Sequence, residues 1–209
     1  MSNVSVERLE VSEPDWSFTM NSYLVRDEAT GATAIVDPGA DAERLLQAAG
    51  PNVQQIWITH ADFDHVQALE KVKAATGAPV LAHALEEDRT PVAVDQIVSH
   101  GYQFNLGETP VLTLFIPGHA PGHVAFVVPG HVLGGDILFP GGPGRTRTPG
   151  NFQLLLQGIE NHLLTLDDAM VVHPGHGDPG TIGEAKRAYD QFKQRPDTEG
   201  LYGDVTWAG

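Results

Sequence analysis

Short runs of apolar residues, separated by turns rich in glycine and proline, predict a chain built from many brief strands and helices. Several runs are aliphatic and β-branched and are too short for a helix, which is typical of buried strands. The predicted strands cover residues 21–26, 32–37, 55–59, 79–82, 111–116, 124–128, 132–138 and 169–172. The first two form a hairpin around a turn at residues 28–31.

Four further segments carry apolar residues at the spacing of an amphipathic helix. The predicted helices cover residues 41–49, 66–76, 152–164 and 181–192, before a tail that we expect to be irregular. Gly50 and Gly77 end the first two, and Thr181 with Glu184 forms a capping box at the start of the last. Strands and helices alternate in two runs. This suggests face-to-face sheets with helices outside, although periodicity alone does not separate that arrangement from other α/β layers.

Composition narrows the classes of protein and partner. The 209 residues fit a single domain over residues 1–209, and no apolar run approaches the ~20 residues that cross a bilayer. A net charge of −15 would repel a nucleic-acid backbone, so we expect a small-molecule substrate and neither nucleic acid nor membrane as partner. The opening residues lack the features of a secretory signal, which makes the cytoplasm the default expectation. Because cysteine is absent, any metal must be held by His, Asp or Glu.

A dense group of possible metal ligands lies in the loop between a predicted strand and the following helix. The run Thr59-His60-Ala61-Asp62-Phe63-Asp64-His65 holds four such side chains within six positions. A polar loop that merely caps the helix would also contain acidic residues. We favour a metal site because further loops repeat the pattern.

Each of those loops places a candidate ligand within or just after a predicted strand. They are Pro117-Gly118-His119-Ala120-Pro121-Gly122-His123, Gly134-Gly135-Asp136 and Pro174-Gly175-His176-Gly177. Singly each is an ordinary turn, but glycine beside a ligand allows close approach of the backbone. Together and in this order they predict one metal centre.

The order and spacing of these motifs resemble the metallo-β-lactamase superfamily, whose signature is His-x-His-x-Asp-His followed by a Gly-His loop, a bridging Asp and a final His. The segments Asn21-Ser22-Tyr23-Leu24-Val25 and Val36-Asp37-Pro38-Gly39 look like that family's first hairpin. The resemblance covers most of the chain and implies the family's α/β fold, a four-layer αββα sandwich.

Within the family, two segments look most like small glyoxalase II-type thioesterases and persulfide dioxygenases. These are Gly144-Arg145-Thr146 and the ending Pro174-Gly175-His176-Gly177. Glyoxalase II hydrolyses glutathione thioesters, and its full-length form binds glutathione with an extra helical domain. The chain ends soon after the last predicted helix, so we expect that domain to be absent.

The resemblance implies a ligand set for two divalent ions. The first ion would take His60, Asp62 and His119. The second would take Asp64, His65 and His176, and Asp136 would bridge the two. The family's second histidine is replaced by Asp62, which gives an HxDxDH variant motif. Asp62 either ligates as a carboxylate, as a Glu does in flavodiiron proteins, or the first site is weakened or lost.

An aspartate at this position changes the charge of the centre. The three carboxylates and a bridging hydroxide balance the charge of two divalent ions, so Asp62 should make the metals poorer Lewis acids and raise the pKa of bound water. The oxygen-rich set shifts preference from zinc toward iron or manganese without fixing the metal.

The predicted reaction is attack of a metal-bound hydroxide on a thioester or other ester-like carbonyl, with Asp64 orienting the nucleophile and Arg145 binding a substrate carboxylate. One alternative is a persulfide dioxygenase with a single Fe(II) on His60, His119 and Asp136. Another is a non-catalytic ligand-binding member of the fold. The remaining histidines should be structural or exposed, although two of them lie near proposed ligands and are candidates to orient them, His123 and His173.

Overall fold

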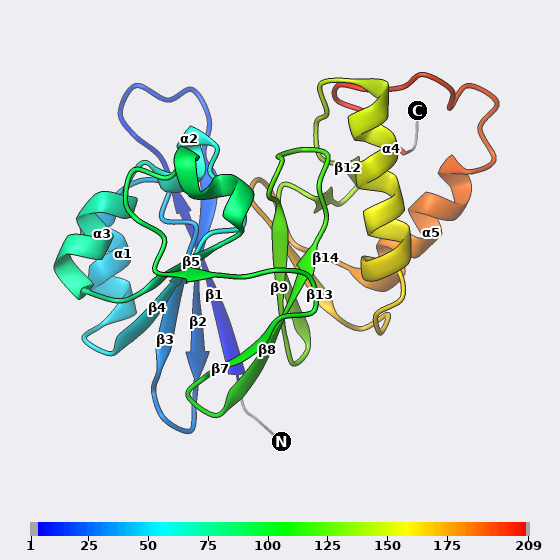
Figure 1. Cartoon of the computed structure of the whole chain (residues 1–209). Helices are drawn as coiled ribbons and strands as arrows, with labels where there is room; N and C mark the ends of the chain where they lie inside the picture. The colour runs from blue at the N-terminus through cyan, green and yellow to red at the C-terminus, as the bar shows by residue number, and fades with distance from the viewer. Residues whose placement is uncertain (1–3, 208–209) are drawn as a thin grey trace.

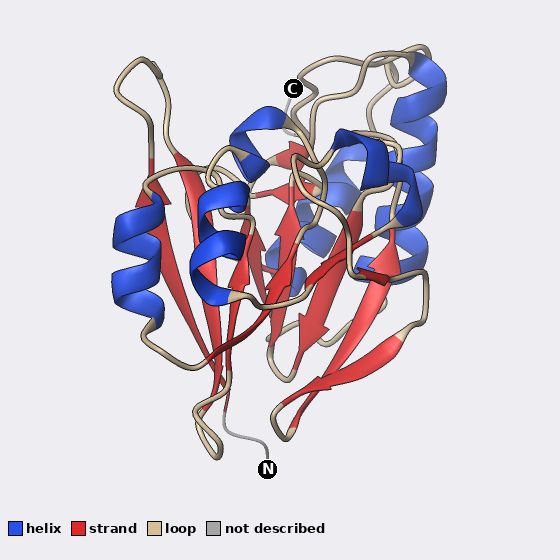
Figure 2. Ribbon diagram, turned by 60° about the vertical axis from the view of Figure 1, so that its left-hand side comes forward, coloured by secondary structure: helices blue, strands red, loops and turns tan. Residues whose placement is uncertain are grey.

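The computed structural model describes residues 4–207 and shows two sheets facing each other with helices on both outer sides (Figures 1 and 2). The first sheet has six strands in the order β1 (Val4–Val11), β2 (Met20–Asp27), β3 (Thr33–Val36), β4 (Val53–Trp57), β5 (Val80–Ala82) and β6 (Gln96–Ile97). The second has the order β14 (Gly180–Thr181), β13 (Val171–Pro174), β10 (His131–Gly135), β9 (Val124–Val128), β8 (Thr109–Phe115) and β7 (Gln103–Leu106). A small hairpin joins β11 (Leu138–Phe139) to β12 (Gly142–Pro143).

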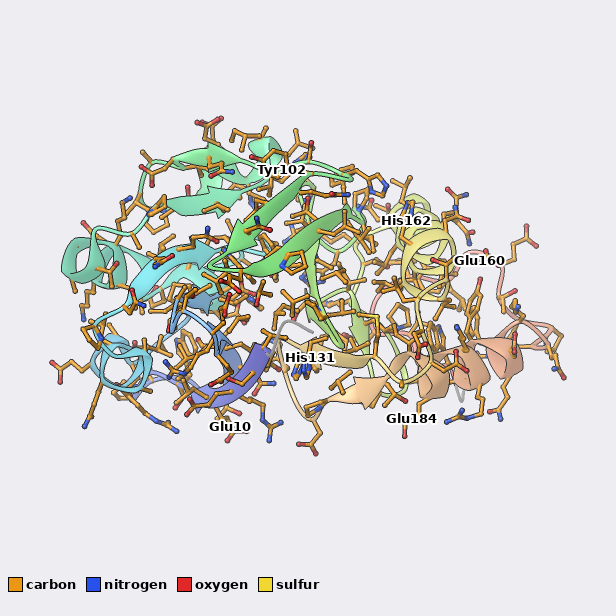
Figure 3. The ribbon with its side chains drawn as sticks, turned by 90° about the horizontal axis from the view of Figure 1, so that it is seen from below. Glu10, Tyr102, His131, Glu160, His162 and Glu184 are labelled. Carbon is orange, nitrogen blue, oxygen red and sulfur yellow. The ribbon has the colours of Figure 1, made fainter. Side chains whose placement is uncertain are left out.

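The helices divide between the two sheets. The helices that alternate with strands of the first sheet are α1 (Ala42–Ala49), α2 (Phe63–Val66), α3 (Leu69–Thr76) and the 3-10 helix η1 (Ala84–Arg89). The second is accompanied by α4 (Pro149–Gly158), the π-helical turn η2 (Ile159–Leu163) and α5 (Ile182–Phe192). Figure 3 looks at the layers from below and shows the two groups of helices at opposite ends of the molecule, with His131 between the two halves.

Three apolar clusters fill the spaces between these layers. One packs α1 and α3 against the first sheet, and another packs α4 and α5 against the second. The third joins the two sheets, where the ring of Trp57 on β4 stacks on Phe126 of β9 with centroids 5.1 Å apart. This confirms the predicted four-layer αββα sandwich. The single domain over residues 1–209 stays a prediction.

Strand direction determines where the functional loops lie. β3 and β4 run parallel, as do β10 and β13, so the carboxyl end of each strand lies beside that of its partner. The residues that follow these strands therefore meet at one edge of the sandwich, the end that points up in Figure 1 near α2 and β12.

Sequence pattern located most central strands but misplaced several boundaries. The predicted strand 132–138 is interrupted after Gly135, which has a positive φ of 49° and turns Asp136 out of the sheet. The predicted helix 66–76 is two helices, and 152–164 begins at Pro149 and ends in the π turn. The last predicted strand, 169–172, lies at Val171–Pro174.

Several strands were not predicted from the sequence. β1 lies at the edge of its sheet and carries charged residues, among them Glu7, Arg8 and Glu10, which break its apolar alternation. β6 and β14 have two residues each, too few for a period-two pattern. The helix signals are confirmed, since Gly50 and Gly77 end α1 and α3, and Thr181 and Glu184 form both bonds of the capping box.

The tail after α5 returns to the edge that carries the functional loops. Trp207 is buried, and its backbone N–H donates to the carbonyl of Gly141 at 2.8 Å. Gly203 pairs with Thr146 through two backbone hydrogen bonds of 2.9 and 3.2 Å. The tail is therefore part of the wall around the site. Over residues 4–207 no helix has the length and apolar character that crossing a membrane requires.

Candidate metal centre

The four loops predicted to carry metal ligands meet at one point. The loop after β4 carries His60 and Asp62, and the short helix α2 that follows carries Asp64 and His65. The loop after β8 carries His119. Asp136 follows β10 and His176 follows β13. Each strand thus delivers its candidate to the same edge of the sandwich, and all seven candidates are brought together there.

The first predicted ligand group is compact. His60, Asp62 and His119 each offer a donor atom within 4.8 Å of the other two. Nε2 of His119 lies 3.5 Å from Oδ2 of Asp62. Asp62 therefore directs its Oδ2 toward His119, while its Oδ1 accepts a hydrogen bond from Arg89.

The second predicted group is equally close. Asp64, His65 and His176 also place donor atoms within 4.8 Å of one another. Nε2 of His176 lies 3.2 Å from Oδ2 of Asp64. Each of the two groups thus gathers one carboxylate oxygen and two histidine nitrogens around its own centre.

Asp136 lies between the two groups. Its Oδ1 is 3.5 Å from Nε2 of His65, and its Oδ2 is 3.7 Å from Nε2 of both His119 and His176. One carboxylate therefore reaches histidines of both groups, which is the placement that a bridging ligand requires.

Buried atoms without partners show that the residues fit metal ions. Within residues 4–207, Nε2 of His60, His65 and His119 and Oδ1 of Asp136 are buried and accept or donate no hydrogen bond. Each such atom costs about 1–3 kcal/mol when left unpaired. Neutral imidazole nitrogens and carboxylate oxygens are donors to zinc, iron and manganese, so divalent ions would satisfy all four atoms at once.

Hydrogen bonds on the far side of each ring fix which nitrogen faces the centre. Nδ1 of His119 donates to the carbonyl of Arg145 at 2.9 Å, and Nδ1 of His176 donates to the carbonyl of Thr19 at 2.8 Å. Nδ1 of His65 lies 3.0 Å from Oδ2 of Asp37. Each arrangement leaves Nε2 as the free acceptor, as histidine ligands require.

Asp37 and Thr59 support the centre, and sequence reasoning did not assign either of them to it. The buried carboxylate of Asp37 accepts from the backbone N–H of Thr59 at 2.7 Å and from its hydroxyl at 2.6 Å. Oγ1 of Thr59 lies 3.0 Å from Nδ1 of His60. Asp37 also falls within ligand distance of His60 and His65, but its oxygens are already engaged. A usable signal was its position directly after a buried strand parallel to β4.

Burial and neighbouring charges shift the pKa values of the histidines at the centre in different directions. Burial lowers the pKa of His65, but the charges of Asp136 and Asp37 outweigh it and raise the pKa well above the ordinary value. His119 and His176 also have raised pKa values, because nearby carboxylates outweigh their burial. Burial, together with the charge of His65, lowers the pKa of His60 well below the ordinary value. A raised pKa favours the protonated ring, so protons compete with metal ions at His65, His119 and His176.

A glycine is required where the last loop approaches the centre. A Cβ atom on Gly175 would collide with Oδ1 of Asp136 and lie 2.5 Å from Cε1 of His65. This confirms the expectation that a glycine beside a ligand serves close approach of the backbone.

The centre opens into a cavity of about 590 Å³. Its walls are formed by Asp62, Asp64, His119, Asp136, Arg145, Thr146, Arg147, Tyr202 and Gly203. The side chain of Arg145 is 72% exposed, and its Nε lies 3.6 Å from Asp204. Arg145 therefore stands at the mouth, where it remains a candidate for binding a substrate carboxylate.

An exposed cluster of aromatic side chains lies next to His176, one of the predicted ligands. Phe18 is 39% exposed and Phe63 is 60% exposed, and the two rings meet edge to face. Trp16 stacks on Phe18 with centroids 4.9 Å apart, and Phe18 meets the ring of His176 at 5.9 Å. An exposed apolar cluster beside a polar centre is a surface suited to an apolar part of a ligand.

His123 and His173 do not orient the ligands through hydrogen bonds. The ring of His123 stacks on that of His60 with centroids 4.3 Å apart, and neither of its nitrogens has a hydrogen-bond partner among the described residues. Nε2 of His173 pairs with Nδ1 of His131 at 3.0 Å instead. The first of these histidines packs against a ligand, and the second belongs to a separate pair.

Comparison with known proteins agrees with this geometry. Residues 18–176 match the family model of the metallo-beta-lactamase superfamily. The chain is 33% identical over 199 residues to hydroxyacylglutathione hydrolase GloC of Haemophilus influenzae, covering 84% of this chain and 93% of that protein.

Solved structures share the fold. TTHA1623, determined in a di-iron-bound form, has a TM-score of 0.74 and 32% identity and covers 87% of this chain and 97% of that one. The BLEG-1 B3 metallo-beta-lactamase has a TM-score of 0.77 and 26% identity, with 94% and 100% covered. ETHE1 from Myxococcus xanthus has a TM-score of 0.74 and 27% identity, with 87% and 82% covered.

Proposed function

The chain belongs to the metallo-β-lactamase superfamily, and on that premise we propose that it is a hydrolase that cleaves a thioester or similar ester-like carbonyl at a centre of two divalent ions. The observation that carries this proposal is the pair of ligand groups that share Asp136. The likeness to TTHA1623 in its di-iron-bound form supports two ions, which would be zinc, iron or manganese.

Seven side chains would hold the ions, in the allocation that the resemblance implies. They are His60, Asp62 and His119 in one group, Asp64, His65 and His176 in the other, and Asp136 between them. Divalent ions held there would polarise a carbonyl oxygen and lower the pKa of water toward neutrality, so that water can act as the nucleophile.

Asp64 is the residue proposed to orient that nucleophile. Its Oδ2 lies 3.2 Å from His176, and the carboxylate also lines the cavity. A carboxylate oxygen there accepts a hydrogen bond from water and aims its lone pair at a bound carbonyl. The oxygen of water would add to the carbonyl carbon and release its proton to solvent. The carbon–sulfur bond of the thioester would then break, and the sulfur would leave as a thiolate.

The side chains around the centre suit a substrate with both acidic and apolar parts. Arg145 and Arg147 line the cavity and suit a carboxylate, while Phe18 and Phe63 suit an apolar group. The relative from Haemophilus influenzae is named for hydroxyacylglutathione, which carries carboxylates and a thioester. A glutathione thioester is therefore the first substrate to test.

A single-metal oxygenase is the second candidate. It would use His60, His119 and Asp136 for Fe(II), and the observation in its favour is that Arg89 already engages one oxygen of Asp62. The intact second ligand group favours the hydrolase, because a one-metal enzyme would not need it.

Metal titration of chelator-stripped protein tests the proposal. Hydrolysis of a hydroxyacyl-glutathione thioester should rise with added Zn²⁺, Fe²⁺ or Mn²⁺ until two ions are bound per chain. A plateau at one Fe²⁺ per chain, with oxygen uptake on glutathione persulfide and no thioester cleavage, would support the oxygenase instead.

A further inference from the structure

The short helix η1 ties together two of the loops that carry predicted ligands. Glu86 on η1 is fully buried, yet both of its oxygens are engaged. Oε2 accepts from the backbone N–H of Ala61 at 2.9 Å, and Oε1 accepts from the backbone N–H of Gly122 at 2.6 Å. Ala61 lies between His60 and Asp62 in the chain. One side chain therefore fixes the loop of the first motif relative to the loop that carries His119.

Arg89, one turn further along η1, connects this anchor to the centre. Its Nη1 donates to Glu86 and its Nη2 donates to Oδ1 of Asp62. The other oxygen of Asp62 lies 3.5 Å from Nε2 of His119. The planar guanidinium thus holds Asp62 so that one oxygen is occupied and the other faces the first ligand group.

The charges of Asp62 and Arg89 would determine how this arrangement affects a bound metal ion. Where the family has a neutral histidine, this chain has an anionic Asp62, which would lower the positive charge of a metal centre. The pair formed by Asp62 and Arg89 has no net charge, as a neutral histidine has none. Glu86 shares Arg89 with Asp62, and two backbone N–H groups also donate to its carboxylate.

We propose that Arg89, anchored by Glu86, is a positioning residue that holds Asp62 as a metal ligand and offsets its negative charge, at the position where the family has a neutral histidine. The inference rests on the proposed metal centre and adds that Asp62 works there only together with Arg89. Arg89 would then offset the loss of Lewis acidity that Asp62 alone would cause. It also follows that Arg89 should lose its importance when residue 62 is itself a histidine.

A double-mutant cycle on metal affinity tests this coupling. Arg89→Met, Asp62→His and the double variant are titrated with Zn²⁺ against a chromophoric chelator and compared with the unmodified chain. In the Asp62 background, Arg89→Met should weaken the binding of one of the two ions about 10–100-fold, as is usual for the loss of a residue that orients a ligand. In the Asp62→His background the same change should alter affinity by no more than about twofold, the scatter of non-interacting sites, or should tighten it.

Two further variants separate positioning from general damage. Arg89→Lys keeps the charge but not the two-pronged geometry, so it should recover part of the affinity lost in Arg89→Met. Arg44→Met removes an arginine whose described bond is to the carbonyl of Glu10 and should leave affinity unchanged. Circular dichroism and melting of the metal-free variants report whether each one folds.

The outcomes distinguish this inference from the function on which it rests. If the unmodified chain binds no divalent ion, the metal centre itself is refuted. If it binds two ions but Arg89→Met weakens them equally with Asp62 and with His at position 62, or not at all with Asp62, only the role of Arg89 is refuted. Should Arg89→Met fail to fold alone, the comparison of Arg89→Lys in the two backgrounds decides in the same way.

Discussion

Replacing Asp37 by asparagine should impair His65 as a metal ligand while leaving all seven predicted ligand side chains in place. The carboxylate accepts three hydrogen bonds, from the N–H and hydroxyl of Thr59 and from Nδ1 of His65. In Asp37→Asn the amide oxygen can still accept from the Thr59 N–H. The amide NH₂ then takes the place of Oδ2 and can only donate. His65 must turn Nδ1 into an acceptor, which moves its proton to Nε2 and points it at the centre.

The size of the effect follows from these contacts. Losing the partner that orients a histidine ligand typically lowers metal affinity about 10–100-fold. Leaving the buried Thr59 hydroxyl or the His65 ring poorly paired should also lower the free energy of unfolding of the metal-free chain by about 1–3 kcal/mol. Asp37 has a φ of 47°, a conformation that asparagine tolerates, so backbone strain does not confuse the result.

Competition titration with a chelator measures the affinity of each ion, and urea unfolding of the metal-free protein measures stability. Asp41→Asn is the matched control, because Asp41 also has a positive φ of 48° but caps α1, where asparagine serves equally well. The ion held by His65 should weaken and the other should change less. If Asp37→Asn binds both ions as tightly as the unmodified chain, Asp37 does not set the tautomer of His65 and the reasoning fails.

Three other changes probe separate parts of the structure. Asp136→Ala should abolish thioester hydrolysis and weaken both ions, since Asp136 reaches both ligand groups, and elemental analysis showing two retained ions would contradict its bridging role. Phe63→Ala should raise KM for an apolar thioester with little change in kcat, because the loss of apolar contact weakens substrate binding by up to about 2 kcal/mol. An unchanged KM would show that the aromatic cluster does not bind substrate. Burial and the charges of His131 and Arg8 lower the pKa of His173 from 6.5 to about 4. As the pH falls, this histidine takes up its proton in the unfolded chain before it does so in the folded chain. The free energy of unfolding should therefore decrease as the pH falls from 6.5 to 4. His173→Gln should therefore gain up to about 3 kcal/mol relative to the unmodified metal-free chain across that range, and urea unfolding curves that stay parallel would show that His173 does not titrate there.

The sequence predicted the candidate ligands because their chemistry is dense and local. Four of the seven lie within residues 60–65, and the others follow strands next to glycine. The central strands were equally accessible, since β9 is a continuous apolar run and β4 ends within the apolar run Ile56-Trp57-Ile58. The family resemblance then supplied the sandwich, which alternation of strands and helices did not determine.

The supporting residues could not be found in that way. Asp37, Glu86 and Arg89 belong to common residue types, and their partners in the ligand loops lie 22 to 36 positions away in the chain. Nothing in the local pattern separates such a residue from a solvated surface charge. Glu86 shows the point well, because an acidic residue in the run Glu86-Glu87-Asp88 reads as exposed and is in fact fully buried.

The most direct test of the two-ion centre is a crystal structure of the metal-loaded protein with anomalous diffraction data at the edge of the bound metal. The proposal predicts two anomalous peaks about 3.5–4 Å apart, the spacing of two-metal sites. One peak should lie among His60, Asp62 and His119 and the other among Asp64, His65 and His176, with Asp136 touching both. A single peak at full metal loading, or peaks away from these side chains, would contradict the account.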